Sequence, residues 1–149
     1  MQKKREKKRL ASLQKLSNTV SSQDISFVCL KHGKKYQANY VNVLYNMICR
    51  HTTADFNFFC ITDDPKNLSP AIKIIPTPDI PVTGWWFKPY IFSKELPLTG
   101  TVMYLDLDVI ISKKIDKILM FEPENLCVIK DFIRCVRPSW NRYNSSVMK

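Results

Sequence analysis

Two aspartates, Asp106 and Asp108, interrupt the largely apolar run of residues 101–111. The run is rich in β-branched and aromatic residues and has no glycine or proline, a composition typical of a buried strand. Because side chains alternate along a strand, we expect both carboxylates on one face, where they repel each other unless a cation lies beside them. Divalent cations such as Mg²⁺ and Mn²⁺ prefer oxygen ligands and commonly bind carboxylates together with substrate phosphates. The pattern therefore predicts a metal–diphosphate site at the end of a strand.

A solvated turn is the alternative, because an Asp-x-Asp triplet is short and occurs by chance in many proteins. The neighbouring residues argue against it, since tyrosine and leucine precede Asp106 while valine and two isoleucines follow Asp108. The triplet by itself leaves the two interpretations balanced, so the surrounding elements must decide between them.

The rest of the chain alternates between strand and helix patterns, which predicts an α/β fold with a largely parallel sheet. In such sheets, ligands bind beyond the carboxyl ends of the strands. Polar residues 31–33, 63–64 and 106–108 each follow or end an expected strand, so we expect them at one rim. The expected strands are residues 25–30, 56–62, 72–75, 102–107, 126–129 and 145–148, and the expected helices are residues 36–50 and 85–94.

Composition narrows the class of protein. A chain of 149 residues that is 45% hydrophobic forms one domain at most, with a sizeable core. No apolar stretch approaches the roughly 20 residues of a membrane span, and the basic N-terminus lacks the apolar core of a secretory signal. The cysteines are odd in number and contain no C-x-x-C pair, which indicates buried, reduced thiols in a cytoplasmic protein rather than disulfides or a zinc site. They are Cys29, Cys49, Cys60, Cys127 and Cys135.

The net charge of +10 is concentrated at the N-terminus, where residues 1–15 contribute +6. One interpretation is a solvated, mobile arm of residues 1–22 ahead of a domain formed by residues 23–149. The other is a short amphipathic helix, whose residues 1–20 would lie peripherally on an anionic membrane or contact nucleic acid. Helical spacing of Leu10, Leu13, Leu16 and Val20 favours the helix. The modest charge of the remaining chain argues against nucleic acid as the main partner.

Six segments, taken in order, resemble the N-terminal part of a GT-A-fold glycosyltransferase. They are most similar to the glycogenin-like and bacterial lipopolysaccharide sugar-transferase group. The segments are FVCLKHG at 27–33, YxxNYVxxLY at 36–45, FFCITDD at 58–64, GWWFKPYIF at 84–92, YLDLD at 104–108 and YNSSVM at 143–148. The ordered set covers about residues 25–149 and is far more specific than the Asp-x-Asp triplet alone.

The resemblance implies a Rossmann-like GT-A sandwich with a mainly parallel sheet, which holds a nucleotide-sugar donor, most simply a UDP-sugar, as a Mn²⁺ or Mg²⁺ complex. The sugar would pass to a hydroxyl of a glycan, lipid or protein acceptor. Carried over by position, Asp106 would approach the ribose or the metal, and Asp108 would coordinate the metal. A metal that bridges the diphosphate oxygens stabilises the charge that grows on the leaving group.

The resemblance also places Tyr36 near the nucleobase, and Asp63 or Asp64 where a carboxylate would accept a hydrogen bond from a uracil-like N–H. Each has a structural alternative. Tyr36 would otherwise be an aromatic residue at the edge of the core, while Asp63 and Asp64 would form a helix cap or turn before a proline.

Lys88 is a candidate for phosphate binding, because its expected helix packs through apolar aromatic residues and its ammonium acts as a point charge. The alternative is a surface lysine whose stem covers apolar atoms. Asn144 and Ser145 would line the sugar or acceptor side, with ordinary polarity at a strand edge as the alternative. We assign no chemistry to His32 in its loop.

The chain departs from the resembling enzymes at Lys149, where they continue through acceptor-binding elements and a histidine that completes the metal shell. The two histidines here, His32 and His51, both lie early in the chain. We therefore expect a domain truncated at its C-terminus: a fragment, a degenerate copy, or a chain that needs a second polypeptide. A catalytically inactive nucleotide-sugar-binding domain is the alternative function. A methyltransferase is disfavoured, since no Gly-x-Gly loop follows the first strand.

Overall fold

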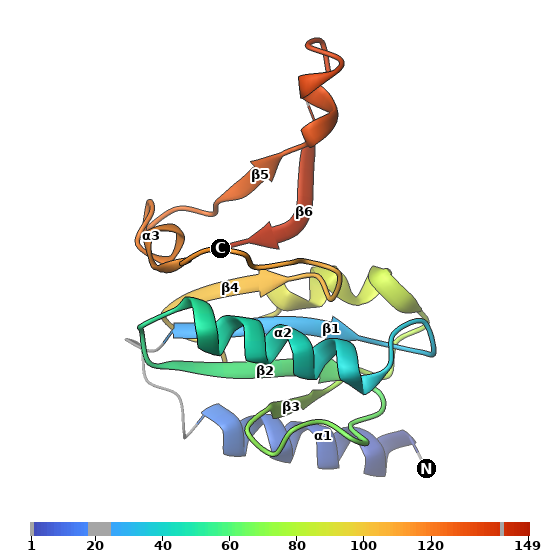
Figure 1. The fold of residues 1–149 in the computed structure, drawn as a ribbon. Helices are drawn as coiled ribbons and strands as arrows, with labels where there is room; N and C mark the ends of the chain where they lie inside the picture. Colours follow the sequence, from blue (N-terminus) through green and yellow to red (C-terminus); the bar gives the residue numbers. More distant parts are fainter. Residues whose placement is uncertain (1, 18–24, 141) are drawn as a thin grey trace.

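The computed structural model describes residues 2–17, 25–140 and 142–149, which form an α/β fold around one mixed sheet (Figure 1). No helix in these residues is long and apolar enough to span a membrane. The elements are α1 (Gln2–Ser17), β1 (Ile25–Lys31), α2 (Ala38–His51), β2 (Phe56–Thr62), β3 (Lys73–Pro76), the 3₁₀ helix η1 (Gly84–Phe92), β4 (Thr101–Leu105), α3 (Asp116–Leu119), β5 (Val128–Lys130), the 3₁₀ helix η2 (Phe132–Cys135) and β6 (Tyr143–Met148).

The sheet has six strands in the order β3-β2-β1-β4-β6-β5. The first four strands of the chain are parallel, and β6 pairs antiparallel with both β4 and β5. This confirms the predicted α/β class with a mainly parallel sheet. The chain adds β2 and β3 on one side of β1 and then crosses to place β4 on the other side. Such a reversal leaves a crevice at the carboxyl ends of β1 and β4, which is where ligands bind in open α/β sheets.

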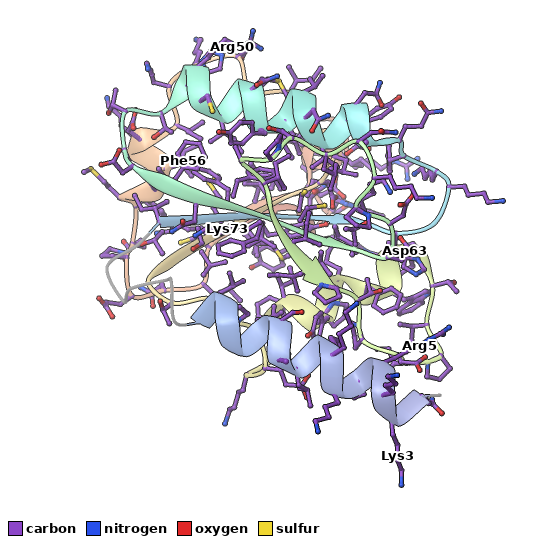
Figure 2. The ribbon with its side chains drawn as sticks, turned by 90° about the horizontal axis from the view of Figure 1, so that it is seen from below. Lys3, Arg5, Arg50, Phe56, Asp63 and Lys73 are labelled. Carbon is purple, nitrogen blue, oxygen red and sulfur yellow. The ribbon has the colours of Figure 1, made fainter. Side chains whose placement is uncertain are left out.

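Two layers cover the sheet, and strand alternation decides which residues each layer meets. Phe27 and Cys29 of β1 pack in one cluster with the buried face of α2, whereas Val28 between them packs in a second cluster with residues of η1. The apolar residues Val41, Leu44 and Ile48 recur at helical spacing in α2, so they lie on one face of the helix. This face packs on the sheet, and all three residues are fully buried. Figure 2 shows α1 and α2 on opposite sides of the sheet.

Residues 2–17 form helix α1, which contacts the domain through the buried side chain of Arg9. Arg9 donates from Nη1 to the Tyr90 hydroxyl at 2.6 Å, and from Nη2 to carboxylates of Glu6 and Glu95 at 2.6 and 2.7 Å. The hydrogen bond with Glu6 is the main cause that raises the pKa of this guanidinium. Leu10 is exposed, and Val20 and the boundary between residues 22 and 23 lie outside the described residues.

Residues 84–92 form a 3₁₀ helix rather than the α-helix predicted for 85–94. Pro89 explains the difference, because within an α-helix it removes a backbone donor and clashes with the preceding turn. The packing also differs from the prediction: Phe87 is buried, whereas Trp85, Trp86 and Phe92 are exposed.

The strand predicted at 102–107 is shorter and earlier in the structure, since β4 ends at Leu105. The Asp106 amide donates to the Ser146 carbonyl at 2.9 Å, and the Val109 amide donates back to the Asp106 carbonyl at 3.2 Å. The chain therefore turns immediately after β4, and the two aspartates lie in that turn. The strand at 56–62 is present as predicted, and the other predicted strands and the helix at 36–50 are present with boundaries shifted by at most two residues.

The C-terminal part projects from the rest of the sheet, with β5, β6 and η2 extending away from the layers around β1 (Figure 1). Many large apolar side chains are exposed in this part, including Phe132 and Val136. Among the free cysteines, Cys29 and Cys60 are buried as predicted, whereas Cys49 and Cys135 are exposed.

Candidate functional site at the carboxyl ends of β1 and β4

Asp106 follows β4 and is surrounded by donors. The Tyr104 hydroxyl donates to its Oδ1 at 2.6 Å, and the Lys88 ammonium lies 2.8 Å from Oδ1 and 3.0 Å from Oδ2. The same ammonium reaches the carbonyl and hydroxyl oxygens of Ser145 on β6, at 3.3 and 3.2 Å. Only 15% of the Lys88 side chain and 25% of that of Asp106 are exposed. Asp106 is thus part of a half-buried polar cluster, not of a freely solvated turn.

Tyr104 keeps its proton in this cluster. Burial raises the pKa of its phenol, and the hydrogen bond to Asp106 raises it further. The hydroxyl is therefore a permanent donor to the carboxylate at neutral pH. Together with Lys88, it contacts the carboxylate of Asp106 beside the end of β4.

Asp108 is exposed and bonds to a different element. The Tyr36 hydroxyl, from the loop before α2, donates to Asp108 Oδ2 at 3.1 Å. Leu107 lies between the two aspartates and is buried in the cluster that includes α2. Both carboxylates nevertheless line one pocket, although strand alternation cannot be the cause because β4 ends at Leu105. The turn after the strand directs them.

This pocket has a volume of about 220 Å³ and lies where the sheet order reverses. Its walls come from the end of β1, the start of η1 and the turn after β4. The residues that line it include Leu30, His32, Lys35, Tyr36, Trp85, Lys88, Tyr104, Asp106 and Asp108. The structure therefore brings together four of the predicted site residues, which are Tyr36, Lys88, Asp106 and Asp108, from separate parts of the chain.

Asp63 and Asp64 lie outside this pocket and support loops. Both carboxylate oxygens of Asp63 accept from the Gly33 amide at 3.2 Å, and Asp64 Oδ1 accepts from the Lys66 amide at 3.2 Å. Figure 2 places Asp63 near the end of β2. The Asp64 contact is of the turn type that the sequence left open as its alternative role, whereas Asp63 joins the loop after β1 to the end of β2.

The two site residues predicted on β6, Asn144 and Ser145, have different contacts in the structure. Ser145 contacts Lys88, whereas Asn144 uses its side-chain oxygen to accept from the Ser146 amide at 2.8 Å. Asn144 therefore shapes the strand locally, and Ser145 is the member of the pair that joins the cluster.

Sequence reasoning missed the roles of His32 and Tyr104. His32 Nδ1 accepts from the Gly84 amide at 3.0 Å, and its ring packs against Phe87 at 4.5 Å, so it ties the end of β1 to η1. No local pattern identifies such a contact. The sequence did contain a pattern that could have identified Tyr104. It lies two residues before Asp106, and a spacing of two directs side chains to one face of an expected strand.

The donor set fits a hard divalent cation. Carboxylates of Asp106 and Asp108 would hold it, with the Ser145 hydroxyl nearby, and oxygen ligands of this kind suit Mg²⁺ or Mn²⁺. Within the described ranges, no group of three or more histidine, cysteine, aspartate or glutamate side chains is placed to hold a metal. Phosphate oxygens and water would therefore have to complete the coordination, as is common for Mg²⁺.

In comparisons with known proteins, no family model matches this chain and no curated protein matches it.

Proposed function

We propose that this chain binds a nucleoside diphosphate sugar, most simply a UDP-sugar, and transfers the sugar to an acceptor hydroxyl through a GT-A-type site. The observation that supports it is the convergence of Asp106, Asp108 and Lys88 in one pocket at the point where the sheet order reverses. Open α/β sheets bind nucleotides at such a point. The ordered segments that resemble GT-A glycosyltransferases support the same function.

The side chains have distinct roles in this proposal. Lys88 is a point charge for a phosphate oxygen, and its contacts to Asp106 and Ser145 direct its ammonium into the site. Tyr36 orients Asp108 through its hydroxyl. A bound Mn²⁺ or Mg²⁺ would neutralise charge on the diphosphate.

The transfer breaks the bond between the anomeric carbon and the diphosphate oxygen, and forms a bond from that carbon to the acceptor oxygen. The acceptor proton is released, and the nucleoside diphosphate leaves with one more negative charge. Lys88 lies where such charge would be stabilised, because preorganised positive groups in a partly buried site are most effective where charge develops.

Calorimetric titration of UDP with and without Mn²⁺ tests the binding step. We expect Asp108→Asn to remain folded and to lose about tenfold or more of the Mn²⁺-dependent affinity, a change of about 1.4 kcal/mol. Asp55→Asn is the matched control, because Asp55 is exposed and lies just before β2, at the other end of that strand from the rim. Equal Mn²⁺-dependent affinity in wild type and folded Asp108→Asn would refute the site.

A second candidate function, donor binding without transfer, is favoured by one observation. The ammonium of Lys88 already neutralises Asp106, so a metal would compete with it for that carboxylate. With this second function, the chain would bind donor weakly and transfer sugar slowly or not at all. The assay measures donor hydrolysis and transfer over a panel of nucleotide sugars. Turnover of about 1 per second or more, an ordinary enzyme rate, would contradict the binding-only function.

A further inference from the structure

Trp85 and Trp86 are the second and third residues of η1, and both are exposed to solvent. The rings stack at a centroid distance of 4.1 Å with an interplanar angle of 24°. Even so, 65% of Trp85 and 58% of Trp86 remain exposed. Large aromatic side chains contribute most when they are buried, and exposed apolar surface beside a polar pocket marks a ligand-binding site.

The geometry of η1 directs Trp85 to the carboxylate pocket. A 3₁₀ helix has about three residues per turn, so residues three apart lie on the same side. Trp85 and Lys88 have this spacing, and both line the pocket with Asp106 and Asp108. Phe87, one position before Lys88, is instead buried against the domain.

Gly84, the residue before Trp85, connects this part of η1 to the domain. Gly84 has a φ of +57°, a conformation that favours glycine, and its amide donates to His32 Nδ1 at 3.0 Å. The start of η1 is therefore tied to the end of β1. A ring at residue 85 is presented at the pocket mouth from a fixed backbone, as a stacking surface requires.

The size of the pocket bears on which part of the substrates could contact the indole ring of Trp85. At about 220 Å³ it is smaller than the roughly 300 Å³ or more of typical small-molecule sites. A diphosphate near Lys88 and the two aspartates would occupy most of this space, so other groups of the substrates would lie outside it. Trp85 both lines the pocket and is exposed, which makes its ring available to such a group.

We propose that Trp85, backed by Trp86, is the stacking surface for a sugar ring of the acceptor, which makes the acceptor a glycan or glycolipid. This rests on the proposed transfer of sugar. A pyranose has an apolar face of C–H groups and a rim of hydroxyls. The indole takes the apolar face, and the charged side chains of the pocket face the hydroxyls.

The test uses the full chain and measures binding by saturation-transfer NMR and calorimetry. The probes are methyl β-D-glucopyranoside, methyl β-D-galactopyranoside, maltose and lactose, each titrated with and without UDP and Mn²⁺. We expect Trp85→Ala and Trp85→Leu to lose about tenfold or more of the sugar affinity, because leucine preserves apolar bulk but not a flat ring. Trp85→Phe, which keeps a flat ring, should retain most of the affinity. Phe92→Ala is the matched control, an exposed aromatic of η1 that does not line the pocket.

The outcomes separate this inference from the proposed function. Unchanged sugar affinity in Trp85→Leu, or no binding of any probe to wild type up to its solubility, would overturn the stacking surface. An equal loss of UDP affinity in these variants would show that Trp85 stacks on the nucleobase, which would overturn the acceptor assignment. Failure of wild type to bind UDP with Mn²⁺ would refute the proposed function, while the titrations without nucleotide still test Trp85.

Discussion

Lys88 determines how Asp106 can act, because its ammonium lies within 3.0 Å of both carboxylate oxygens. A lysine that pairs with a carboxylate and also points into a pocket has two possible partners, the carboxylate and a phosphate. Removal of the lysine should raise the affinity for the metal and lower the affinity for the nucleotide. Without the ammonium, the two neighbouring carboxylates attract a metal cation more strongly.

We therefore expect Lys88→Met to bind Mn²⁺ alone more tightly than wild type, and to bind UDP with Mn²⁺ less tightly, by about tenfold. Calorimetry with the metal alone and with metal plus nucleotide measures both changes. Lys94→Met is the control, since Lys94 is exposed and lies just after η1. Parallel changes in both affinities would show that the ion pair is only structural.

Asp116 gives a prediction about pH. Hydrogen bonds from the Thr53 amide and the Thr52 hydroxyl, at 2.8 and 2.7 Å, lower its pKa from 3.8 to about 2. A lowered pKa stabilises the fold above the unfolded value, and this contribution disappears as the pH falls through the folded value. We expect Asp116→Ala to have a lower Tm than wild type at pH 6. The difference should shrink between about pH 4 and pH 2, and calorimetric scans across this range measure it. A difference that does not vary with pH would contradict the assignment.

At the scale of elements, η1 depends on its first residue. Gly84 has a φ of +57°, and a Cβ added there would meet no atom within 4 Å. Backbone strain is therefore the only local cost of a side chain at this position. We expect Gly84→Ala to lower the free energy of unfolding by about 1 kcal/mol, measured by urea denaturation. Thr83→Ala, at an extended and exposed neighbour, should have little effect. Equal stability of both variants would contradict this account.

Helix α1 combines one buried cation with an exposed basic surface. Arg9 is directed into the domain, while Lys3, Lys4, Lys7 and Lys8 are exposed. Figure 2 shows Lys3 pointing away from the body of the protein. This separates anchoring from surface charge, so the contribution of each can be measured independently.

We propose peripheral binding of this helix to anionic membranes and expect replacement of those four lysines by glutamine to weaken it. Each lysine near such a surface contributes about 1 kcal/mol, and the interaction decreases with salt. Co-sedimentation with vesicles of anionic phospholipid, at low and high salt, measures it, and the Tm should stay close to that of wild type. Arg9→Met is the contrasting variant, which should lower the Tm because it leaves Glu95 without this partner. Equal vesicle binding by wild type and the lysine variant would exclude this surface.

At the scale of the whole molecule, apolar exposure is uneven. Between residues 110 and 136, Ile110, Met120 and Val136 are at least 80% exposed, and Phe121 and Phe132 at least 60%. Scattered exposure is normal in proteins, but a concentration of large apolar side chains in one part of a chain favours association.

We expect the purified chain to associate as its concentration increases, measured by size-exclusion chromatography with light scattering. Replacing Met120 and Phe121 by serine should reduce the association without a large loss of stability, because both side chains are exposed. The matched control is Val43→Ser, an exposed apolar residue of α2. A monomer at every concentration would contradict this prediction.

The sequence by itself determined the class of fold and the location of the candidate site along the chain. The short apolar run at residues 27–30 and the helical spacing of Val41, Leu44 and Ile48 are local patterns, so they predict a strand and a helix before any contact is known. Because polar residues at the carboxyl ends of parallel strands meet at one rim, the sequence also predicts a site at Asp106 and Asp108.

Tertiary structure alone decided which of these residues meet. The bond between Tyr36 and Asp108 joins residues 72 apart, and the contact between Lys88 and Ser145 joins residues 57 apart. It also decided that β6 runs antiparallel to β4 and that Arg9 anchors α1. The physical reason is that such contacts depend on how whole elements pack, and their energies come from burial and pairing of groups that leave no periodic pattern in the sequence.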